Sequence, residues 1–145
     1  MARTLIIIKP DAVRRQLIGT VLARFEEASF KILAMSLTRL SADDARAFYA
    51  VHAERPFFDD LCTFMTSGPC VPCLIEGGDD VIPRVRALMG ATDPAEADPG
   101  TIRGDLAESK QNNLVHGSDG PETARAEIEF FTGRLGWTTQ MAAVR

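Results

Sequence analysis

Four short apolar runs, separated by segments with helical periodicity, most constrain what this chain can fold into. Runs of this length bounded by Gly, Pro or polar residues are typical of buried strands. The intervening segments place apolar residues three or four positions apart, as one face of a helix does. The predicted strands are Arg3–Ile8, Phe30–Leu40, Cys70–Ile75 and Leu114–His116.

The order of these segments predicts a fold class. Two strand–helix–strand units that share one antiparallel sheet give a ferredoxin-like α+β sandwich, an α/β sandwich in which helices cover a four-stranded antiparallel sheet. Helix boundaries come from local signals: a capping box at Ser41–Asp44 before a helix that carries His52, Pro56 opening the next, Asp80 capping one that ends at Gly90, and Asp119–Glu122 starting the last.

The segment Ala91–Asn113 breaks this pattern. It contains Pro94, Pro99, Gly100 and Gly104 and has no sustained periodicity. Irregular segments of this length in a compact protein usually carry function.

Length and charge limit the classes of protein to consider. The 145 residues predict a single domain spanning 1–145, because nothing resembles a linker or a repeat. The net charge of −4 gives no basic field for nucleic acid. No apolar run approaches the ~20 residues needed to cross a membrane, and Leu5–Ile8 is too short for a signal-peptide core. We therefore expect a cytoplasmic protein.

The three cysteines include a C-x-x-C pair, Cys70 and Cys73, beside the isolated Cys62. Redox pairs of this spacing work at a helix N-terminus, whereas this pair lies in a predicted strand. Residues three apart in a strand point to opposite faces, which separates the two thiols. We expect core cysteines, although thiol chemistry stays an alternative.

Chemistry concentrates around one histidine. The chain lacks the phosphate-loop and dinucleotide-binding glycine motifs. His116 lies where a strand ends and a helix begins, in the polar segment Asn112–Asp119. Arg86 and Arg103 precede it, and an imidazole among such donors points to a phosphoryl group that histidine attacks as a nucleophile. The residues alone leave open that His116 is merely a capping or loop histidine.

Glu127 is a candidate partner for that imidazole. It follows His116 by eleven residues and borders the apolar stripe of the predicted last helix. A carboxylate within reach fixes the ring and raises its basicity. An exposed helical glutamate is the alternative.

Six sequence blocks, in this order along residues 3–132, resemble nucleoside diphosphate kinases. The active-site signature is Leu114–Asp119, Leu-Val-His-Gly-Ser-Asp. The other blocks are Ile7–Val13, Arg55–Phe58, Met65–Pro69, Met89–Pro94 and Pro99–Asp105. The resemblance implies a ping-pong enzyme that moves the γ-phosphate of a nucleoside triphosphate, mainly ATP, to a nucleoside diphosphate through a phosphohistidine.

The resemblance also implies residue roles at the catalytic centre. His116 is then the nucleophile, and Glu127 orients its ring with Ser118 beside the carboxylate. Lys9 reaches the phosphate and the ribose 3′-OH, and Tyr49 directs its hydroxyl toward the histidine.

The resemblance assigns nucleotide binding to five more residues. Asn113 binds the ribose, Arg86, Thr92 and Arg103 clamp the phosphates, and Phe57 stacks on the base. Stacking reads no base edge, so a broad range of nucleosides is expected. The family implies Mg²⁺ carried mainly by the nucleotide phosphates, with no metal-binding residues of the protein.

One departure from the family pattern concerns Lys110, which stands where an aliphatic residue commonly covers the second face of the base. Its methylene stem can still pack there while the ammonium reaches water. The substitution is expected to alter base affinity more than the chemistry.

Two other functions remain in view. A phosphocarrier domain needs a histidine but no nucleotide clamp, and a non-catalytic binding module needs neither. The family also implies a homo-oligomer, with a tetramer or hexamer favoured over a dimer, and the sequence does not choose among them.

Overall fold

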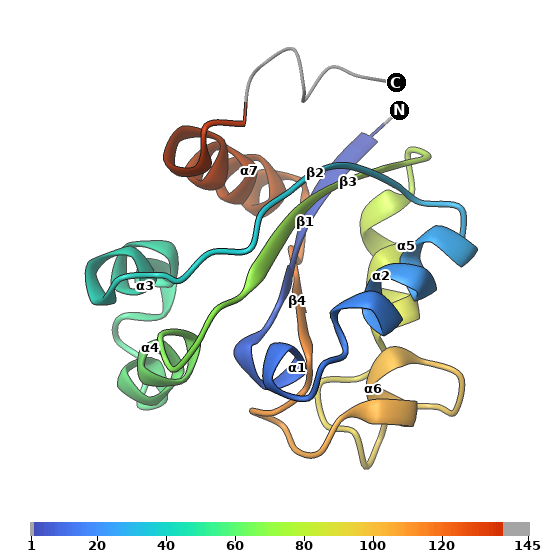
Figure 1. The fold of residues 1–145 in the computed structure, drawn as a ribbon, viewed down its shortest axis with the longest axis horizontal. Coiled ribbons are helices and arrows are strands. Elements are labelled where there is room, and N and C mark those ends of the chain that lie inside the picture. Colours follow the sequence, from blue (N-terminus) through green and yellow to red (C-terminus); the bar gives the residue numbers. More distant parts are fainter. Residues whose placement is uncertain (1, 138–145) are drawn as a thin grey trace.

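The computed structural model describes residues 2–137 of the chain, which form one antiparallel sheet flanked by helices on both faces (Figure 1). The strands are β1 (Ala2–Ile8), β2 (Lys31–Met35), β3 (Val71–Gly77) and β4 (Val115–Gly117), in the spatial order β2-β3-β1-β4. All three pairings are antiparallel. The predicted four-stranded α+β sandwich is therefore confirmed.

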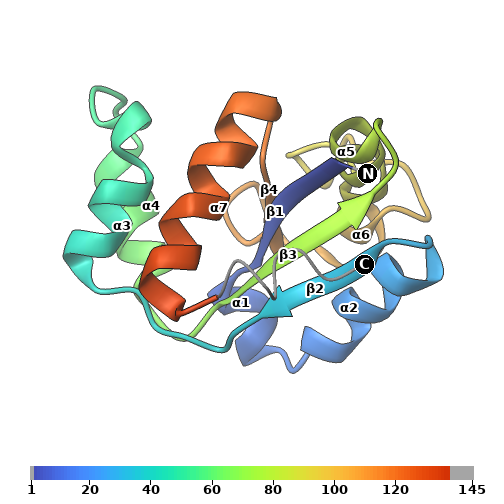
Figure 2. The same ribbon diagram turned by 90° about the horizontal axis from the view of Figure 1, so that it is seen from above.

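Helices divide between the two faces of the sheet, as the view from above shows (Figure 2). One face carries α2 (Ile18–Glu27) and α5 (Val81–Met89), and the other carries α3 (Ala42–Phe48), α4 (Phe58–Met65) and α7 (Pro121–Leu135). Two short helices, α1 (Pro10–Arg14) and α6 (Ile102–Leu106), lie near the same end of the sheet (Figure 1).

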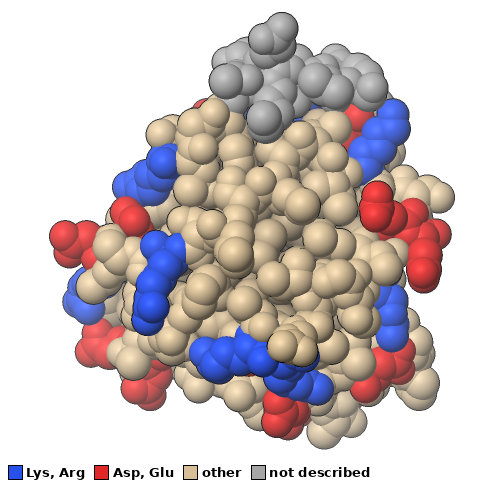
Figure 3. Space-filling view, in the orientation of Figure 1, with Lys and Arg blue, Asp and Glu red and all other residues tan. Residues whose placement is uncertain are grey.

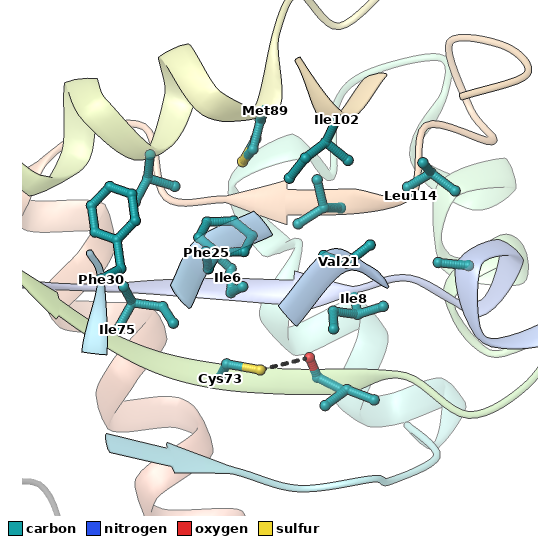
Figure 4. Packing of buried hydrophobic residues seen from close by; sticks show 14 of the residues in the cluster. Ile6, Ile8, Val21, Phe25, Phe30, Cys73, Ile75, Met89, Ile102 and Leu114 are labelled. Atoms are coloured by element: carbon teal, nitrogen blue, oxygen red, sulfur yellow. Dashed lines mark hydrogen bonds between the residues drawn. The ribbon is translucent and has the colours of Figure 1, made fainter. Parts of the chain in front are cut away.

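Alternation along β1 builds two separate cores. Ile6 and Ile8 pack with α2 and α5, and Figure 4 shows part of this cluster. Leu5 and Ile7 pack with α3, α4 and α7. Each fully buried side chain of this size contributes ~1.5–3 kcal/mol to stability, so the sheet is anchored on both faces.

The two thiols of the C-x-x-C pair lie in different cores, as predicted. Cys73 belongs to the α2/α5 cluster and Cys70 to the other. Both are unpaired, and burial raises the pKa of each to about 12. These thiols are protonated core residues, as predicted, although the strand begins at Val71 rather than Cys70, which only bridges Thr38.

Some predicted boundaries were wrong. The second strand ends at Met35 rather than Leu40, because the ladder shifts register between Ile32 and Ala34 and only Thr38 then bridges Cys70. The capping box at Ser41 is confirmed, since its hydroxyl accepts the Asp44 N–H at 3.0 Å.

Two of the helices that follow these signals are shorter than predicted. The helix begun by the capping box ends at Phe48, and His52 lies in a separate 3₁₀ turn. Helix α4 begins at Phe58, so Pro56 does not open it. Asp80 precedes α5 but makes no capping hydrogen bond through its side chain, while Gly90 ends that helix with φ +89°.

The irregular segment Ala91–Asn113 contains one element that its periodicity did not reveal. Helix α6 is five residues long, and the Thr101 hydroxyl caps it by accepting the Gly104 N–H. A single turn this short buries too few residues to show a period. Residue 1 and residues 138–145, which include most of the weakly patterned tail, lie outside the described residues. No helix of the described part is both long and apolar enough to cross a bilayer.

Candidate active site

Strand β4 places His116 on the α3/α7 side of the sheet. His116 pairs with Ile7 of β1, whose side chain faces that core. Its neighbour Gly117 leaves no room on the opposite face, because a Cβ there would lie 2.7 Å from the Met89 sulfur of α5. Glycine at this position lets the end of β4 approach α5 closely.

A short hydrogen-bonded chain holds the imidazole. His116 Nε2 lies 3.0 Å from Glu127 Oε1 of α7. Ser118 donates its hydroxyl to the same carboxylate oxygen at 2.6 Å. Glu127 is mostly buried, and an ionised carboxylate only accepts hydrogen bonds. This geometry favours the imidazole tautomer with its proton on Nε2, which leaves the lone pair on Nδ1.

Two aromatic rings from the end of α3 border the imidazole. The centroids of Phe48 and Tyr49 lie 5.6 Å and 6.2 Å from that of His116, both in edge-to-face orientation. Burial, with a smaller contribution from Glu127, raises the pKa of Tyr49. Tyr49 therefore stays a neutral hydroxyl beside the histidine.

Lys9 lies at the end of β1 and is almost fully buried. Its Nζ donates to the Gln111 carbonyl at 2.9 Å and to Asn113 Oδ1 at 2.8 Å. Burial lowers the pKa of Lys9 to about 8, against an opposing contribution from Asp11. A cation is thus held next to the chain segment that leads into β4.

Asn113 joins Lys9 to the loop after α5. Its Nδ2 donates to the Thr92 carbonyl at 3.2 Å while its Oδ1 accepts from Lys9. Its backbone carbonyl accepts from Arg103 Nε at 3.3 Å. Through its side chain and its backbone carbonyl, Asn113 therefore links three of the residues that the sequence proposed for the nucleotide.

Arg103 of α6 is a buried guanidinium whose hydrogen bonds go mainly to backbone carbonyls. Nη1 donates to Gly90 at 3.0 Å and Nη2 to Val115 at 2.6 Å, in addition to the bond with Asn113. Burial, followed by the nearby charge of Arg86, lowers the pKa of Arg103 to about 10. The side chain is rigidly placed and remains a cation at neutral pH.

Arg86 of α5 reaches the other end of β4, where its Nη1 donates to the Gly117 carbonyl at 3.2 Å. Arg86, Thr92 and Arg103 line one cavity of about 420 Å³. Glu96 and Asp98 line it too, and sequence reasoning did not expect carboxylates there. His116 is not among its lining residues, so this cavity does not by itself define the reaction centre.

Phe57 and Lys110 are exposed candidate residues, as are Arg86 and Thr92. Phe57 precedes α4 with 48% of its surface exposed, and its ring lies 5.5 Å from that of His52. Lys110 Nζ lies 3.9 Å from Asp93 Oδ2, and 76% of its side chain is exposed. Both are free to contact a ligand from solvent.

Sequence reasoning assigned no role to Phe48 or Asp11. Phe48 lay on a predicted apolar helix face, where a core aromatic gives the same pattern as one that borders a histidine. Asp11 lies two residues after Lys9, and the structure buries its carboxylate. The local sequence pattern does not indicate that burial. Within residues 2–137, no group of three or more His, Cys, Asp and Glu side chains is arranged to hold a metal ion.

Comparisons with known proteins agree on one family. The family profile described as nucleoside diphosphate kinase matches residues 2–134. A nucleoside diphosphate kinase of Desulfatibacillum aliphaticivorans is 60% identical over 131 residues, covering 90% of this chain and 94% of that protein. One from Burkholderia mallei is 58% identical over 131 residues, covering 90% and 92%.

Solved structures give the same result. The Aquifex aeolicus nucleoside diphosphate kinase superposes with a TM-score of 0.86 at 45% identity, covering 89% of this chain and 93% of that one. The Halobacterium salinarum nucleoside diphosphate kinase in complex with CDP superposes at 0.85 with 42% identity, covering 90% and 86%.

The chain belongs to the nucleoside diphosphate kinase family. It is a phosphotransferase that moves the γ-phosphate of a nucleoside triphosphate to a nucleoside diphosphate, by the family's ping-pong reaction through a phosphohistidine. The phosphocarrier and non-catalytic interpretations are set aside by this assignment.

Proposed function

We propose that His116 carries the phosphoryl group and that Nδ1 is the attacking atom. The observation behind this proposal is the 3.0 Å contact of His116 Nε2 with Glu127, which occupies the other ring nitrogen. Glu127 positions the ring and stabilises the positive charge that develops on it. Ser118 fixes the carboxylate through its 2.6 Å hydrogen bond.

The reaction has two balanced steps. In the first, the Nδ1 lone pair of His116 attacks the γ-phosphorus, the bond from that phosphorus to the β,γ-bridging oxygen breaks, and the nucleoside diphosphate leaves. In the second, a terminal β-phosphate oxygen of another nucleoside diphosphate attacks the same phosphorus and the P–N bond breaks. The Nε2 proton stays between the imidazole and Glu127 throughout.

The cationic residues supply the field for the transferred group. Arg86, Thr92 and Arg103 clamp the phosphates, Lys9 contacts the phosphate and the ribose 3′-OH, and Asn113 contacts the ribose. These roles are supported by the hydrogen bonds that connect Asn113 with Lys9, Thr92 and Arg103. Preorganised charges of this kind stabilise the equatorial oxygens of the transition state.

The base binds at the rim of the site. Phe57 stacks on it, and 48% of its surface is exposed to solvent. Tyr49 directs its hydroxyl toward the histidine rather than the base. The CDP complex of the Halobacterium salinarum relative supports pyrimidine nucleotides among the substrates here.

Mg²⁺ is the proposed cofactor, carried mainly by the nucleotide phosphates. Magnesium keeps several waters and commonly binds through substrate phosphates with few protein ligands. It supplies neutralising charge on the phosphates, while the residues above hold and orient the nucleotide.

A homo-oligomer, tetrameric or hexameric in preference to dimeric, is proposed as the assembly. Edge strand β2 exposes Met35 and the chain after it exposes Leu37, with 55% and 66% of their surfaces accessible. The centre of the face in Figure 3 is uncharged, with charged side chains around its rim. Among residues 2–137, β2 pairs with β3 alone. An apolar strand edge left unpaired is prone to pair with another chain, and light scattering measures the resulting mass.

A single domain over residues 1–145 and a cytoplasmic location remain predictions. The single domain is supported by the family match over residues 2–134. Limited proteolysis tests it, because one domain gives no stable internal fragment.

The experiment for the mechanism is phosphoryl labelling. Incubation with γ-labelled ATP is expected to give an acid-labile, base-stable label on the protein, and added nucleoside diphosphate is expected to remove it as labelled triphosphate. His116→Ala should abolish labelling with the fold intact, whereas a variant that still labels rules out His116. His52→Ala, which changes the only other histidine, is the matched control and should label as the wild type does.

A further inference from the structure

Asp11 is a buried carboxylate for which neither the fold nor the proposed chemistry yet gives a reason. It lies in the first turn of α1 and is only 2% exposed. Its Oδ1 has no hydrogen-bond partner in the described part of the chain. A buried polar atom without a partner is costly, so this carboxylate calls for an interaction that offsets the cost.

The other oxygen of Asp11 joins the turn after β1 to the segment before β4. Asp11 Oδ2 accepts the Leu114 N–H at 3.1 Å, and Lys9 N donates to the Leu114 carbonyl at 2.8 Å. Leu114 has φ +75°, a left-handed conformation that disfavours a side chain. The two hydrogen bonds hold Leu114 in this conformation two residues before His116.

The charge of Asp11 acts on Lys9. The Lys9 ammonium donates only to uncharged oxygens, those of Gln111 and Asn113. Burial alone disfavours its charged form. Asp11 opposes that effect and raises the pKa of Lys9, which still ends at about 8. Burial raises the pKa of Asp11 itself, and Lys9 opposes that shift.

We propose that Asp11 is a positioning residue for phosphoryl transfer: its carboxylate fixes the approach to the His116 strand and balances the buried Lys9 ammonium that meets the nucleotide. The Asp11 side chain thereby links Lys9 to the strand that carries His116. The inference rests on the proposed roles of Lys9 and His116.

The other groups that face Lys9 come from three elements. Arg103 on α6 lowers the pKa of Lys9. On α4 the uncharged Phe64 ring lies 5.1 Å from Nζ, and Arg14 of α1 lies 6.0 Å from the same ring. Asp11 is thus the acidic group that raises the pKa of Lys9 among these neighbours.

The test is direct titration of Lys9 in the full-length enzyme. The chain has only three lysines, so ¹³Cε NMR signals are few, and Lys31 and Lys110 are exposed internal controls. Asp11→Asn keeps an acceptor for Leu114 but removes the charge. The Lys9 midpoint is expected near 8 in the wild type and lower by about one pH unit in the variant. An unchanged midpoint would overturn the proposal.

Glu76→Gln is the matched control. Glu76 is also a buried carboxylate with one unpartnered oxygen, at the other end of the central strand pair, where it binds Arg3. Its removal is expected to leave the Lys9 midpoint unchanged, and an equal shift there would contradict a specific role for Asp11. Asp11→Ser also lacks the charge and provides a hydroxyl for the Leu114 N–H, so it decides the question if Asp11→Asn fails to fold.

The restraint of Leu114 by Asp11 is tested separately, by hydrogen exchange. Asp11→Ala removes the acceptor, so the Leu114 amide should exchange with solvent faster than in Asp11→Asn. Equal exchange in the two variants would refute the contact as a restraint.

The pH dependence of kcat/KM tests whether the charge balance between Asp11 and Lys9 affects the reaction. Because kcat/KM reports ionisations of the free enzyme, and Lys9 must be charged to meet phosphate, kcat/KM should fall above pH 8 in the wild type and at lower pH in Asp11→Asn. Phosphohistidine formation that persists in His116→Ala would defeat the proposed function. An unchanged Lys9 midpoint with normal labelling of His116 would defeat only the role of Asp11.

Discussion

The two parts of the site are held in different ways. The histidine group, His116 with Glu127 and Ser118, is connected by hydrogen bonds between side chains. The cationic group, Lys9, Arg86 and Arg103, donates mainly to backbone carbonyls. Substitutions in the histidine group should therefore change the chemistry, whereas substitutions in the cationic group should change the stability of the fold as well.

The strongest test of this contrast is Arg103→Met. The change leaves the carbonyls of Gly90, Asn113 and Val115 without their donor. Each lost buried hydrogen bond costs ~1–3 kcal/mol, so denaturant unfolding should show a loss of about 4 kcal/mol. Arg125→Met, at an exposed position of α7, should lose less than about 0.5 kcal/mol. Equal losses of unfolding free energy in the two variants would refute a structural role for the Arg103 hydrogen bonds.

Glu127→Gln tests the other side of the contrast. The amide keeps the size of the side chain but no longer stabilises a positive imidazole, so kcat should fall roughly 100-fold. The free energy of unfolding should change by less than about 1 kcal/mol, since one hydrogen-bonding oxygen remains. Steady-state kinetics and denaturant unfolding measure both. Glu129→Gln, an exposed neighbour on α7, should leave kcat unchanged.

Ser118→Ala should have an intermediate effect. The hydroxyl contacts Glu127 rather than His116, so its loss leaves the carboxylate in place but less restrained. We expect kcat to fall about tenfold, as for other residues that orient a functional side chain. A fall as large as that of Glu127→Gln would mean that Ser118 acts on the reacting group directly.

Lys110→Leu should have the smallest effect. Lys110 is exposed and its contact with Asp93 is long, so neither stability nor kcat depends on it. An apolar side chain beside the base should change KM a few-fold, because covering one more apolar contact is worth ~1 kcal/mol. Nucleotide KM values measured for several bases check this, and an unchanged KM for every base would refute it.

The sequence allowed more of the histidine group to be predicted than of the cationic group. His116 and Glu127 lie in adjacent elements, a short strand and the helix after it, so the apolar stripe of that helix made Glu127 a candidate partner. An exposed glutamate stayed the alternative until the family resemblance assigned the pair. The structure gives the distance between the two side chains as 3.0 Å. The short chain between the two residues restricts how far apart they can lie, which is why spacing could propose Glu127 as a partner.

The cationic group required long-range information. Lys9 and Asn113 are 104 residues apart, and their contact depends on the β1–β4 pairing and the left-handed turn at Leu114. The hydrogen bonds of Arg103 to carbonyls depend on α6, whose single turn leaves no periodic signal. Resemblance to the family supplied these residues, and spacing alone did not.

The fold shows the same division. The four strands and their order along the chain followed from apolar runs, because a sheet that is buried on both faces needs apolar residues on both sides of each strand. The end of β2 did not follow, since a register shift depends on the neighbouring strand rather than on local residues. Capping signals succeeded at Ser41 and failed at Asp80, where the geometry of the preceding turn decides whether the side chain can reach an N–H.

The position of the phosphoryl group on the imidazole tests the central claim most directly. If Glu127 holds Nε2, transfer from γ-labelled ATP must give phosphohistidine substituted at Nδ1. Two-dimensional NMR of the ¹⁵N-histidine enzyme, correlated with ³¹P after phosphorylation, distinguishes the two ring nitrogens of His116. We expect coupling of phosphorus to Nδ1 alone, and a phosphoryl group on Nε2 would refute the proposed role of Glu127.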